Sequence, residues 1–324
     1  MKILLIVRNR IEEFYGRFAT VIEFGLRLAL SFLTLLAVRG NLGYNTLLSQ
    51  LWFIMAFSVV CAFIKIRALP IILGAYTAMQ TASLSLGVGV TCFLVMLILY
   101  LLTFRLDSKY GYALLAMVLF YIVKIPLAIP LVLAVVAPVS SVITVIGGNV
   151  IYYMLHYISV NSAVLTGYSQ SGEITVASVF INGLLTYKEF VYQLLIITLV
   201  FLVMGIVRRI NMNHANNMTM AIGAGAYLIL ALITNVILGM LTFSKLRILI
   251  LGTLGALIIA LILGNILLPL DFSKAENLEF EDDEYHYYVR AVPKIALDRE
   301  KVHVTRINSR KQATGKKENT EVKG

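Results

Sequence analysis

The sequence predicts an all-α protein, a polytopic bundle of membrane-spanning helices followed by a small polar tail. The 324 residues are 60% hydrophobic and only 14% charged, whereas soluble domains are about 45–50% apolar and about 25% charged. One helical crossing needs roughly 20 consecutive apolar residues, and a soluble core has no use for longer uncharged runs. Four long stretches lack Asp, Glu, Lys and Arg: Ala68–Phe104, Ile125–Gly172, His214–Ser244 and Ile248–Leu270.

The net charge of +10 is distributed as membrane topology requires. Residues 1–270 hold sixteen Lys and Arg against six Asp and Glu, and residues 271–324 hold eleven of each class. The basic excess therefore lies in short loops between apolar segments, where positive charge orients helices in the bilayer. This pattern predicts membrane lipid as the surroundings of the chain and needs no nucleic-acid partner.

Eight or ten spans are expected from the apolar segments. The segment from Gly111 to Ile158 is composite, because Pro126, Pro130 and Pro138 interrupt it and each removes a backbone donor. Its length fits one full crossing plus a broken or re-entrant hairpin, or three short helices. The single spans are expected at Thr20–Val38, Leu47–Ile64, Leu69–Leu86, Val88–Phe104, Phe190–Val207, Met220–Leu241 and Ile248–Leu268.

The loops orient these spans. Basic residues cluster before the first span and after the second, the fourth and the span that ends near Val207, whereas Ser159–Thr186 has neither Lys nor Arg. Because basic loops stay inside, we expect a multi-pass protein of the cell membrane with both termini in the cytoplasm and an external loop at Ser159–Thr186.

Four regions follow from this pattern. Residues 1–19 form a cytoplasmic or interfacial N-terminus, and residues 20–270 form the transmembrane bundle. Residues 271–308 form a small tail in which Tyr285–Val292 and Lys301–Ile307, rich in aromatic and β-branched residues, predict a β-hairpin. Residues 309–324 have the polar composition of a disordered tail.

The tail carries a resemblance. Its stretch EFEDDEYHYYVRAVPKI, residues 279–295, resembles the tail of uncharacterised multi-pass membrane proteins of Firmicutes-type bacteria, some of which are labelled permeases. The resemblance implies a permease-like membrane protein and brings no known catalytic residues with it.

Lys124 is the foremost candidate for a functional residue. It lies inside an apolar segment, directly before Pro126 and Pro130, and a lysine at the bilayer centre costs at least about 2.5 kcal/mol. One interpretation is a substrate anchor or a proton-coupled switch beside a broken helix, where transporters build their sites. The other is a lysine near the end of a short helix that snorkels to the interface.

Pro126 and Pro130 are candidates for the same substrate path as Lys124, and further polar residues join them. Gln80, Ser140, Ser141 and Asn149 lie within apolar segments, and each either lines such a path or bonds across helices as structural glue. The two serines and Asn149 are also candidate acceptors for the Lys124 ammonium, if the following hairpin folds back to the same depth.

Glu23 and Arg27 form a candidate ion pair. They lie four residues apart with the acid first, the favourable order on one helix face. Pairing lowers the cost of placing both in the first span, and an interfacial position of this part of the helix is the alternative.

The sequence contains no motif of an enzyme or a metal site. HExxH, GxSxG and the phosphate-binding GxxxxGK[ST] pattern do not occur, and the four histidines share no metal-ligand spacing. Cys61 and Cys92 lie in apolar segments and are expected to be packing residues without a disulfide. No catalytic residue, cofactor or metal is therefore expected.

Two functions remain. The first is a transporter or permease for a small solute, favoured by the broken central region and by Lys124. The alternative is a non-transport scaffold or envelope-assembly component that binds a protein partner through its cytoplasmic tail.

Overall fold

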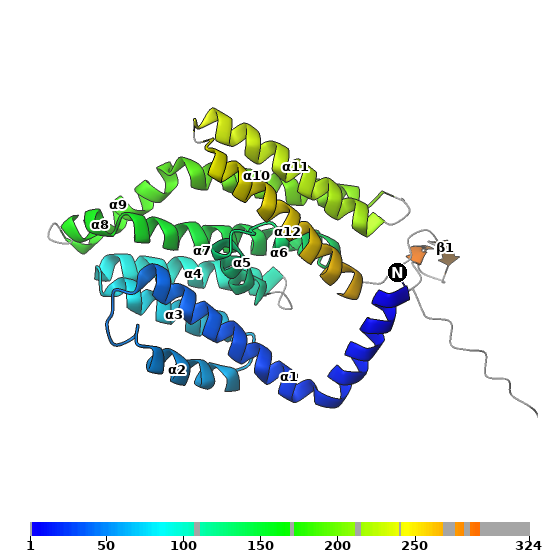
Figure 1. The fold of residues 1–324 in the computed structure, drawn as a ribbon, viewed down its shortest axis with the longest axis horizontal. Helices are drawn as coiled ribbons and strands as arrows, with labels where there is room; N and C mark the ends of the chain where they lie inside the picture. The colour runs from blue at the N-terminus through cyan, green and yellow to red at the C-terminus, as the bar shows by residue number, and fades with distance from the viewer. Residues whose placement is uncertain are drawn as a thin grey trace, which may run out of the picture.

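The computed structural model is a bundle of helices that run roughly parallel or antiparallel to one long axis (Figure 1). It describes residues 2–106, 111–168, 172–210, 215–239, 241–267, 276–281 and 286–291. The predicted all-α architecture of the bundle is confirmed. Its elements are α1 (Lys2–Leu42), α2 (Leu51–Phe63), α3 (Leu69–Ala82), α4 (Leu86–Leu106), α5 (Ala113–Ile122), α6 (Ala128–Val136), η1 (Val139–Ser141), α7 (Val142–Val160), α8 (Ser162–Tyr168), α9 (Glu173–Thr186), α10 (Lys188–Val207), α11 (Ala215–Ile237) and α12 (Phe243–Leu267).

Among the described residues, six helices are long and apolar enough to cross a membrane, fewer than the eight or ten expected. The correction comes from α2 and α3, predicted as full spans but only 13 and 14 residues long. At 1.5 Å per residue each is about 20 Å long, against a hydrocarbon core of about 30 Å. The six spans are Arg17–Leu42, Leu86–Leu106, Val139–Val160, Lys188–Val207, Asn216–Ile237 and Phe243–Gly264.

The first span begins at a bend in α1. Phe18 has non-helical backbone angles, with φ −123° and ψ 25°, and divides the long helix in two. Figure 1 shows the N-terminal part turned away from the rest of α1. The bend lies beside the predicted boundary between residues 19 and 20.

The region from Gly111 to Ile158 contains a broken hairpin followed by one long helix. Helix α5 has 10 residues and α6 has 9, so each is too short to cross a bilayer alone. The turn at Pro138 then leads through η1 into α7, which makes the one full crossing. This is the first of the two arrangements that the sequence left open.

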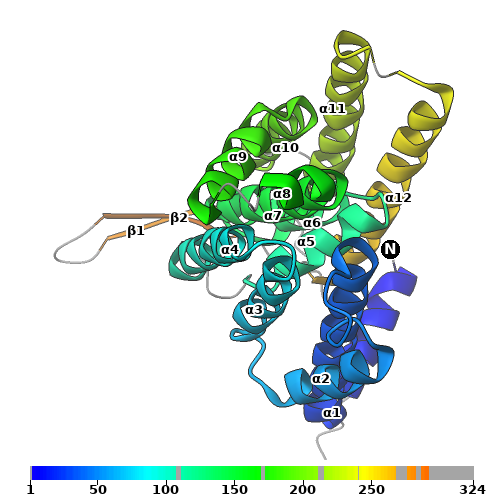
Figure 2. The same ribbon diagram turned by 90° about the vertical axis from the view of Figure 1, so that its left-hand side faces the viewer.

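Two groups of buried apolar side chains hold the bundle together, and α7 contributes to both. One group joins α7 to α1, α2, α3, α4 and α9. The other joins α7 to α5, α6, α10, α11 and α12. Viewed along the bundle, α1 and α2 lie on one flank and α11 and α12 on another, with α5 to α7 between them (Figure 2).

The two ends of the bundle differ. The N-terminus and the tail hairpin lie at one end, and α8 lies at the other (Figure 1). The predicted external loop Ser159–Thr186 is not an extended loop, because it contains α8 and the apolar helix α9. Helix α9 packs against α4 and α10. The prediction of a loop missed this tertiary contact.

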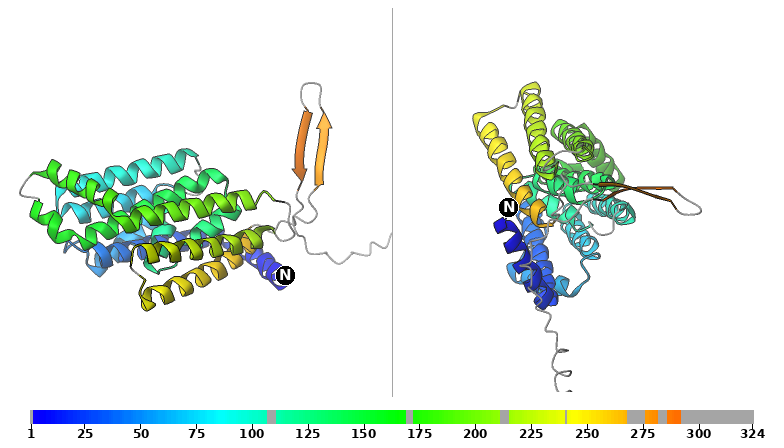
Figure 3. Two further views of the ribbon diagram at one scale, coloured as in Figure 1. Left: turned by 90° about the horizontal axis from the view of Figure 1, so that it is seen from above. Right: turned by 90° about the vertical axis from the view of Figure 1, so that its right-hand side faces the viewer.

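The tail contains an antiparallel pair of strands, β1 (Glu276–Glu281) and β2 (His286–Ala291), with Leu278 opposite Val289. Figure 3 shows this hairpin projecting from the bundle. The predicted strand Tyr285–Val292 is thus paired with the preceding acidic segment, through a short connection that costs little loop-closure entropy. Lys301–Ile307 and the predicted disordered segment 309–324 lie outside the described residues.

A first test concerns the approach of α12 to the broken hairpin. A Cβ added at Gly252 would lie 2.5 Å from the carbonyl oxygen of Lys124, so Gly252→Ala forces the two segments apart. We expect a loss of about 1–3 kcal/mol of stability, measured as a lower melting temperature in detergent micelles.

The matched control is Gly225→Ala on α11, where an added Cβ would meet nothing within 4 Å. Alanine favours the helix over glycine by at most about 1 kcal/mol, so this variant should melt at or above the temperature of the unmodified protein. Equal melting temperatures for the two variants would contradict the close approach.

Candidate functional site

The candidate site is built around the break between α5 and α6. Helix α5 ends when the N–H of Lys124 donates to the carbonyl of Tyr121 at 3.0 Å and the N–H of Ile125 donates to that of Phe120 at 2.8 Å. This pair of bonds is a Schellman motif, in which the residue after the cap adopts the left-handed conformation. Pro126 follows at once and cannot continue the helix.

Lys124 occupies the left-handed position of this motif. Its φ is 64°, and it is the one non-glycine residue with positive φ in the part of the chain that the structure describes. Glycine is the usual residue there, because a Cβ makes the left-handed conformation costly. A lysine in place of glycine is a strained choice of the kind found at functional sites.

The break lies beside the middle of the last candidate span. Gly252 packs against the carbonyl of Lys124 and lies nine residues after Phe243 and twelve before Gly264, the two ends of that span. The helical rise places Gly252 about 13 Å from one end of the span and about 18 Å from the other. The carbonyl of Lys124 therefore lies beside the middle of this candidate span.

A polar cavity of about 310 Å³ opens beside the break. Helices α5, α7, α10, α11 and α12 and the segment before α6 contribute its walls. The lining residues are Tyr121, Lys124, Pro126, Leu127, Tyr152, Tyr153, Glu189, Gln193, Tyr227, Asn235, Lys245, Ile248, Leu249, Gly252 and Thr253.

Three charged side chains line the polar cavity. Lys245 Nζ lies 3.4 Å from Glu189 Oε1, and these residues lie in the first turns of α12 and α10. The hydroxyl of Tyr187 donates to Glu189 Oε2 at 3.1 Å. Lys124 is exposed to the cavity, and none of the described acceptors lies within hydrogen-bonding distance of its ammonium.

Tyrosine rings form one wall. The rings of Tyr121 and Tyr152 stack with centroids 4.4 Å apart, and Tyr153 meets Tyr152 edge-on at 5.2 Å. Among the other lining residues, Gln193 Nε2 donates to the hydroxyl oxygen of Tyr227 at 2.9 Å. The Tyr227 hydroxyl hydrogen therefore remains available for another acceptor.

Two of the predicted path residues line this cavity, Lys124 and Pro126. Asn149 lies just behind the wall, buried, with its Oδ1 accepting from the Tyr121 hydroxyl and its Nδ2 without a hydrogen-bond partner. Pro130 is buried within α6 and is not a lining residue.

The remaining candidates lie elsewhere. Gln80 bonds to the amide of Asn45 at 3.0 Å and to Tyr76 and Ser49, so it ties α3 to the loop after α1. Ser141 donates to the Pro138 carbonyl at 2.7 Å, and its neighbour Ser140 shares the η1 turn. Neither serine lies within hydrogen-bonding distance of Lys124, because η1 follows α6 and is therefore a full helix away from the break.

The Glu23–Arg27 pair forms, with 2.7 Å between the side chains. Both residues lie on α1, and neither lines the polar cavity. Arg27 is 22% exposed and Glu23 47%, so the pair screens its own charges on an outer face of the bundle.

Several site residues were not singled out from the sequence. Glu189 and Gln193 lie four residues apart and therefore on one face of α10, a signal that the sequence did carry. Tyr152, Tyr153 and Lys245 have no local sequence signal that marks them as site residues. Their convergence depends on tertiary contacts among α7, α10 and α12.

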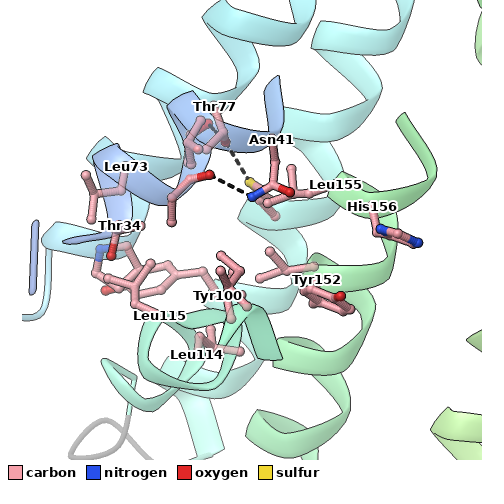
Figure 4. A pocket seen from close by; sticks show the side chains of 18 residues that line it. Thr34, Asn41, Leu73, Thr77, Tyr100, Leu114, Leu115, Tyr152, Leu155 and His156 are labelled. Atoms are coloured by element: carbon pink, nitrogen blue, oxygen red, sulfur yellow. Dashed lines mark hydrogen bonds between the residues drawn. The ribbon is translucent and has the colours of Figure 1, made fainter. Parts of the chain in front are cut away.

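A second cavity, between α1, α3, α4, α5 and α7, is mainly apolar (Figure 4). Its volume of about 50 Å³ leaves room for a water molecule or two. Two of its polar side chains already have partners, since Thr77 donates to Met96 Sδ at 3.1 Å and Asn41 to the Ala37 carbonyl at 2.8 Å. Tyr152 belongs to the lining of both cavities. The polar cavity is therefore the better candidate site.

No group of three or more His, Cys, Asp or Glu that could hold a metal occurs among the described residues. Cys61 and Cys92 are buried free thiols, as expected.

A separate contact attaches α9 to α4. The carboxylate of Glu173, at the start of α9, accepts from the Ser85 hydroxyl at 2.6 Å and from the Gly87 amide at 2.5 Å. These bonds satisfy donors in the first turn of α4. They also lower the pKa of Glu173, because both stabilise the charged carboxylate.

No protein-family model matches the sequence, and neither a curated protein nor a solved structure matches it. The functional argument therefore depends on the polar cavity and the helices around it.

The Glu173 contact has a predictable dependence on pH. Because the folded-state pKa is depressed, the contact is fully present above the ordinary value of 4.5 and is lost as the pH falls through the lower folded value. We expect the Gly87 amide to be protected from hydrogen exchange at pH 7 and to lose protection once the carboxylate is protonated.

The variant Glu173→Ala removes the acceptor and should expose the Gly87 amide to exchange already at pH 7. Ser178→Ala on the same helix is the control, because that hydroxyl donates to the Thr175 carbonyl of its own helix. Unchanged protection of Gly87 in Glu173→Ala would refute the contact.

Proposed function

We propose that this chain carries a small solute across the cell membrane and that the polar cavity is its binding site. The observation that supports this proposal best is that Lys124, an exposed lysine at the break between α5 and α6, lines a cavity that contains other polar groups.

The energetic argument is the cost of that lysine. A charged side chain at mid-membrane costs at least about 2.5 kcal/mol on insertion scales, and the left-handed backbone at Lys124 adds about 1 kcal/mol. A purely structural turn would avoid both costs with a glycine. A binding role accounts for them, because the lysine places a strong donor where a solute must pass.

The broken hairpin supports the same proposal. Many secondary transporters bind their solute near the middle of the bilayer at interrupted helices, whose free backbone groups face the site. Here the break between α5 and α6 lines the cavity through Lys124 and Pro126. The Glu189–Lys245 pair at the helix ends provides a polar entrance on one side.

The orientation belongs to the same proposal. With six spans, the two termini fall on one side of the membrane, and Figure 1 places the N-terminus and the tail hairpin at the same end. Basic residues favour the cytoplasm, so that end faces inward and α8 faces outward.

The experiment is a test of access from both sides. Thr253 lines the cavity at mid-span, ten residues after Phe243 and eleven before Gly264, and Thr253→Cys replaces it with a side chain of similar size. In a background with Cys61→Ala and Cys92→Ala, a carrier that alternates between open states should react with a membrane-impermeant thiol reagent in both right-side-out and inside-out vesicles.

Two controls accompany this test. Leu254→Cys, the next residue on α12, is 51% exposed on the outer face of the bundle and should stay unlabelled in lipid. Thr166→Cys on α8 is exposed and should react only in right-side-out vesicles. Labelling of Thr253→Cys from one side only, or from neither, would argue against transport.

The tail supports a second candidate function, that of a membrane scaffold. An isolated two-stranded hairpin is marginally stable in water, and its unpaired edges accept a further strand from a partner. In the described part of the chain β1 and β2 pair only with each other. A protein partner at this hairpin is the basis of the scaffold function.

The two functions make opposite predictions for the phenotype of cells that depend on this protein. For a carrier, Lys124→Asn should abolish the phenotype, whereas truncation after Leu270 should leave most of it. For a scaffold, the truncation should abolish it and Lys124→Asn should be silent.

A further inference from the structure

We propose that the solute of the polar cavity is a small organic monoanion, a carboxylate on a compact apolar or aromatic body. This inference rests on the proposed function only for the passage of the solute; binding itself is independent of transport. It follows from the charge, the donors and the walls of the cavity.

The charges of the lining residues indicate the sign of the charge on the solute. Lys245 and Glu189 pair with each other across 3.4 Å and cancel. Lys124 then leaves one positive charge that no described carboxylate neutralises. At low dielectric an uncompensated charge is costly, so one negative charge on the solute restores neutrality.

The available donors fit a carboxylate. Its two oxygens accept about four hydrogen bonds, and an ammonium–carboxylate bond is of the strong, charge-assisted class. The Tyr227 hydroxyl, whose oxygen already accepts from Gln193, can donate only to a further acceptor. Tyr152 and Tyr153 supply additional hydroxyls in the lining.

The walls fit a compact apolar body. The stacked rings of Tyr121 and Tyr152 offer a flat aromatic surface, and aromatic partners prefer offset or edge-to-face contact with such rings. Leu127, Ile248 and Leu249 line the cavity beside them. A volume of about 310 Å³ is at the lower end for ligand pockets, which favours a body of one ring over a nucleotide or a lipid.

An organic cation is the main competitor, because tyrosine rings also bind cations through their faces. The carboxylate that such a cation needs is already engaged, since Glu189 holds Lys245 and accepts from Tyr187. Lys124, which also lines the cavity, would moreover repel a cation. The observations therefore favour the anion.

The test uses benzoate as the probe, with the full chain in nanodiscs of neutral phosphatidylcholine, so that no anionic lipid headgroup competes. Radiolabelled benzoate should bind saturably, cyclohexanecarboxylate should displace it, and choline and inorganic phosphate should not. Restoring phosphatidylglycerol should leave binding intact; if it displaces benzoate, the site takes a lipid headgroup and the proposal of a free carboxylate is wrong.

The decisive variant is Lys124→Asn. Asparagine tolerates the left-handed backbone, so the Schellman turn is kept while the charge is removed, and the affinity for benzoate should fall at least about tenfold. Lys124→Arg should retain most of the affinity, and Lys65→Asn, which makes the same change outside the cavity lining, should retain all of it.

The outcomes separate this inference from the proposed function. Saturable benzoate binding that needs Lys124, together with one-sided labelling of Thr253→Cys, would support the anion site and refute transport. Labelling of Thr253→Cys from both sides, with no benzoate binding tighter than a dissociation constant of about 1 mM, would support transport. It would contradict the proposal that the solute is an organic anion. Equal binding by Lys124→Asn, or preference for choline, would also overturn it.

Discussion

The end of α5 at Lys124 is the constraint on which the central half of the bundle depends. Two backbone hydrogen bonds close the helix there, and Pro126 prevents its continuation. The chain then turns back as α6 without crossing the membrane, and Gly252 lets α12 pack against the exposed carbonyl of Lys124. A side chain at Gly252 would force α12 and this turn apart.

The cavity exists because this turn keeps two short helices from filling the space of one long span. Helices α7, α10, α11 and α12 are each long and apolar enough to span a membrane and contribute to its walls, while α5 and α6 are each too short to do so. Tyrosines line the cavity, and their rings have apolar faces for packing and hydroxyl groups for hydrogen bonding. Packing and polarity are thereby combined in one set of residues.

The substrate-path candidates differ in where they lie relative to this turn. Lys124 and Pro126 belong to the cavity because they form the turn itself, and Asn149 supports its wall through Tyr121. Gln80 is a structural bond between α3 and a loop, a role that composition alone could not distinguish from a path. Ser140 and Ser141 lie at the next turn, since α6 carries the chain a helix length away from Lys124.

The sequence by itself determined the membrane-spanning helical class, the broken region around the three prolines and the unusual position of Lys124. These depend on local properties, namely apolar length, the missing proline N–H and the cost of a buried charge. The tertiary structure decided the number of long spans, the helical nature of α8 and α9 and the partner of strand β2. It also brought Glu189, Gln193, Tyr227 and Lys245 to the same cavity as Lys124, because their meeting depends on how distant helices pack and not on their spacing along the chain.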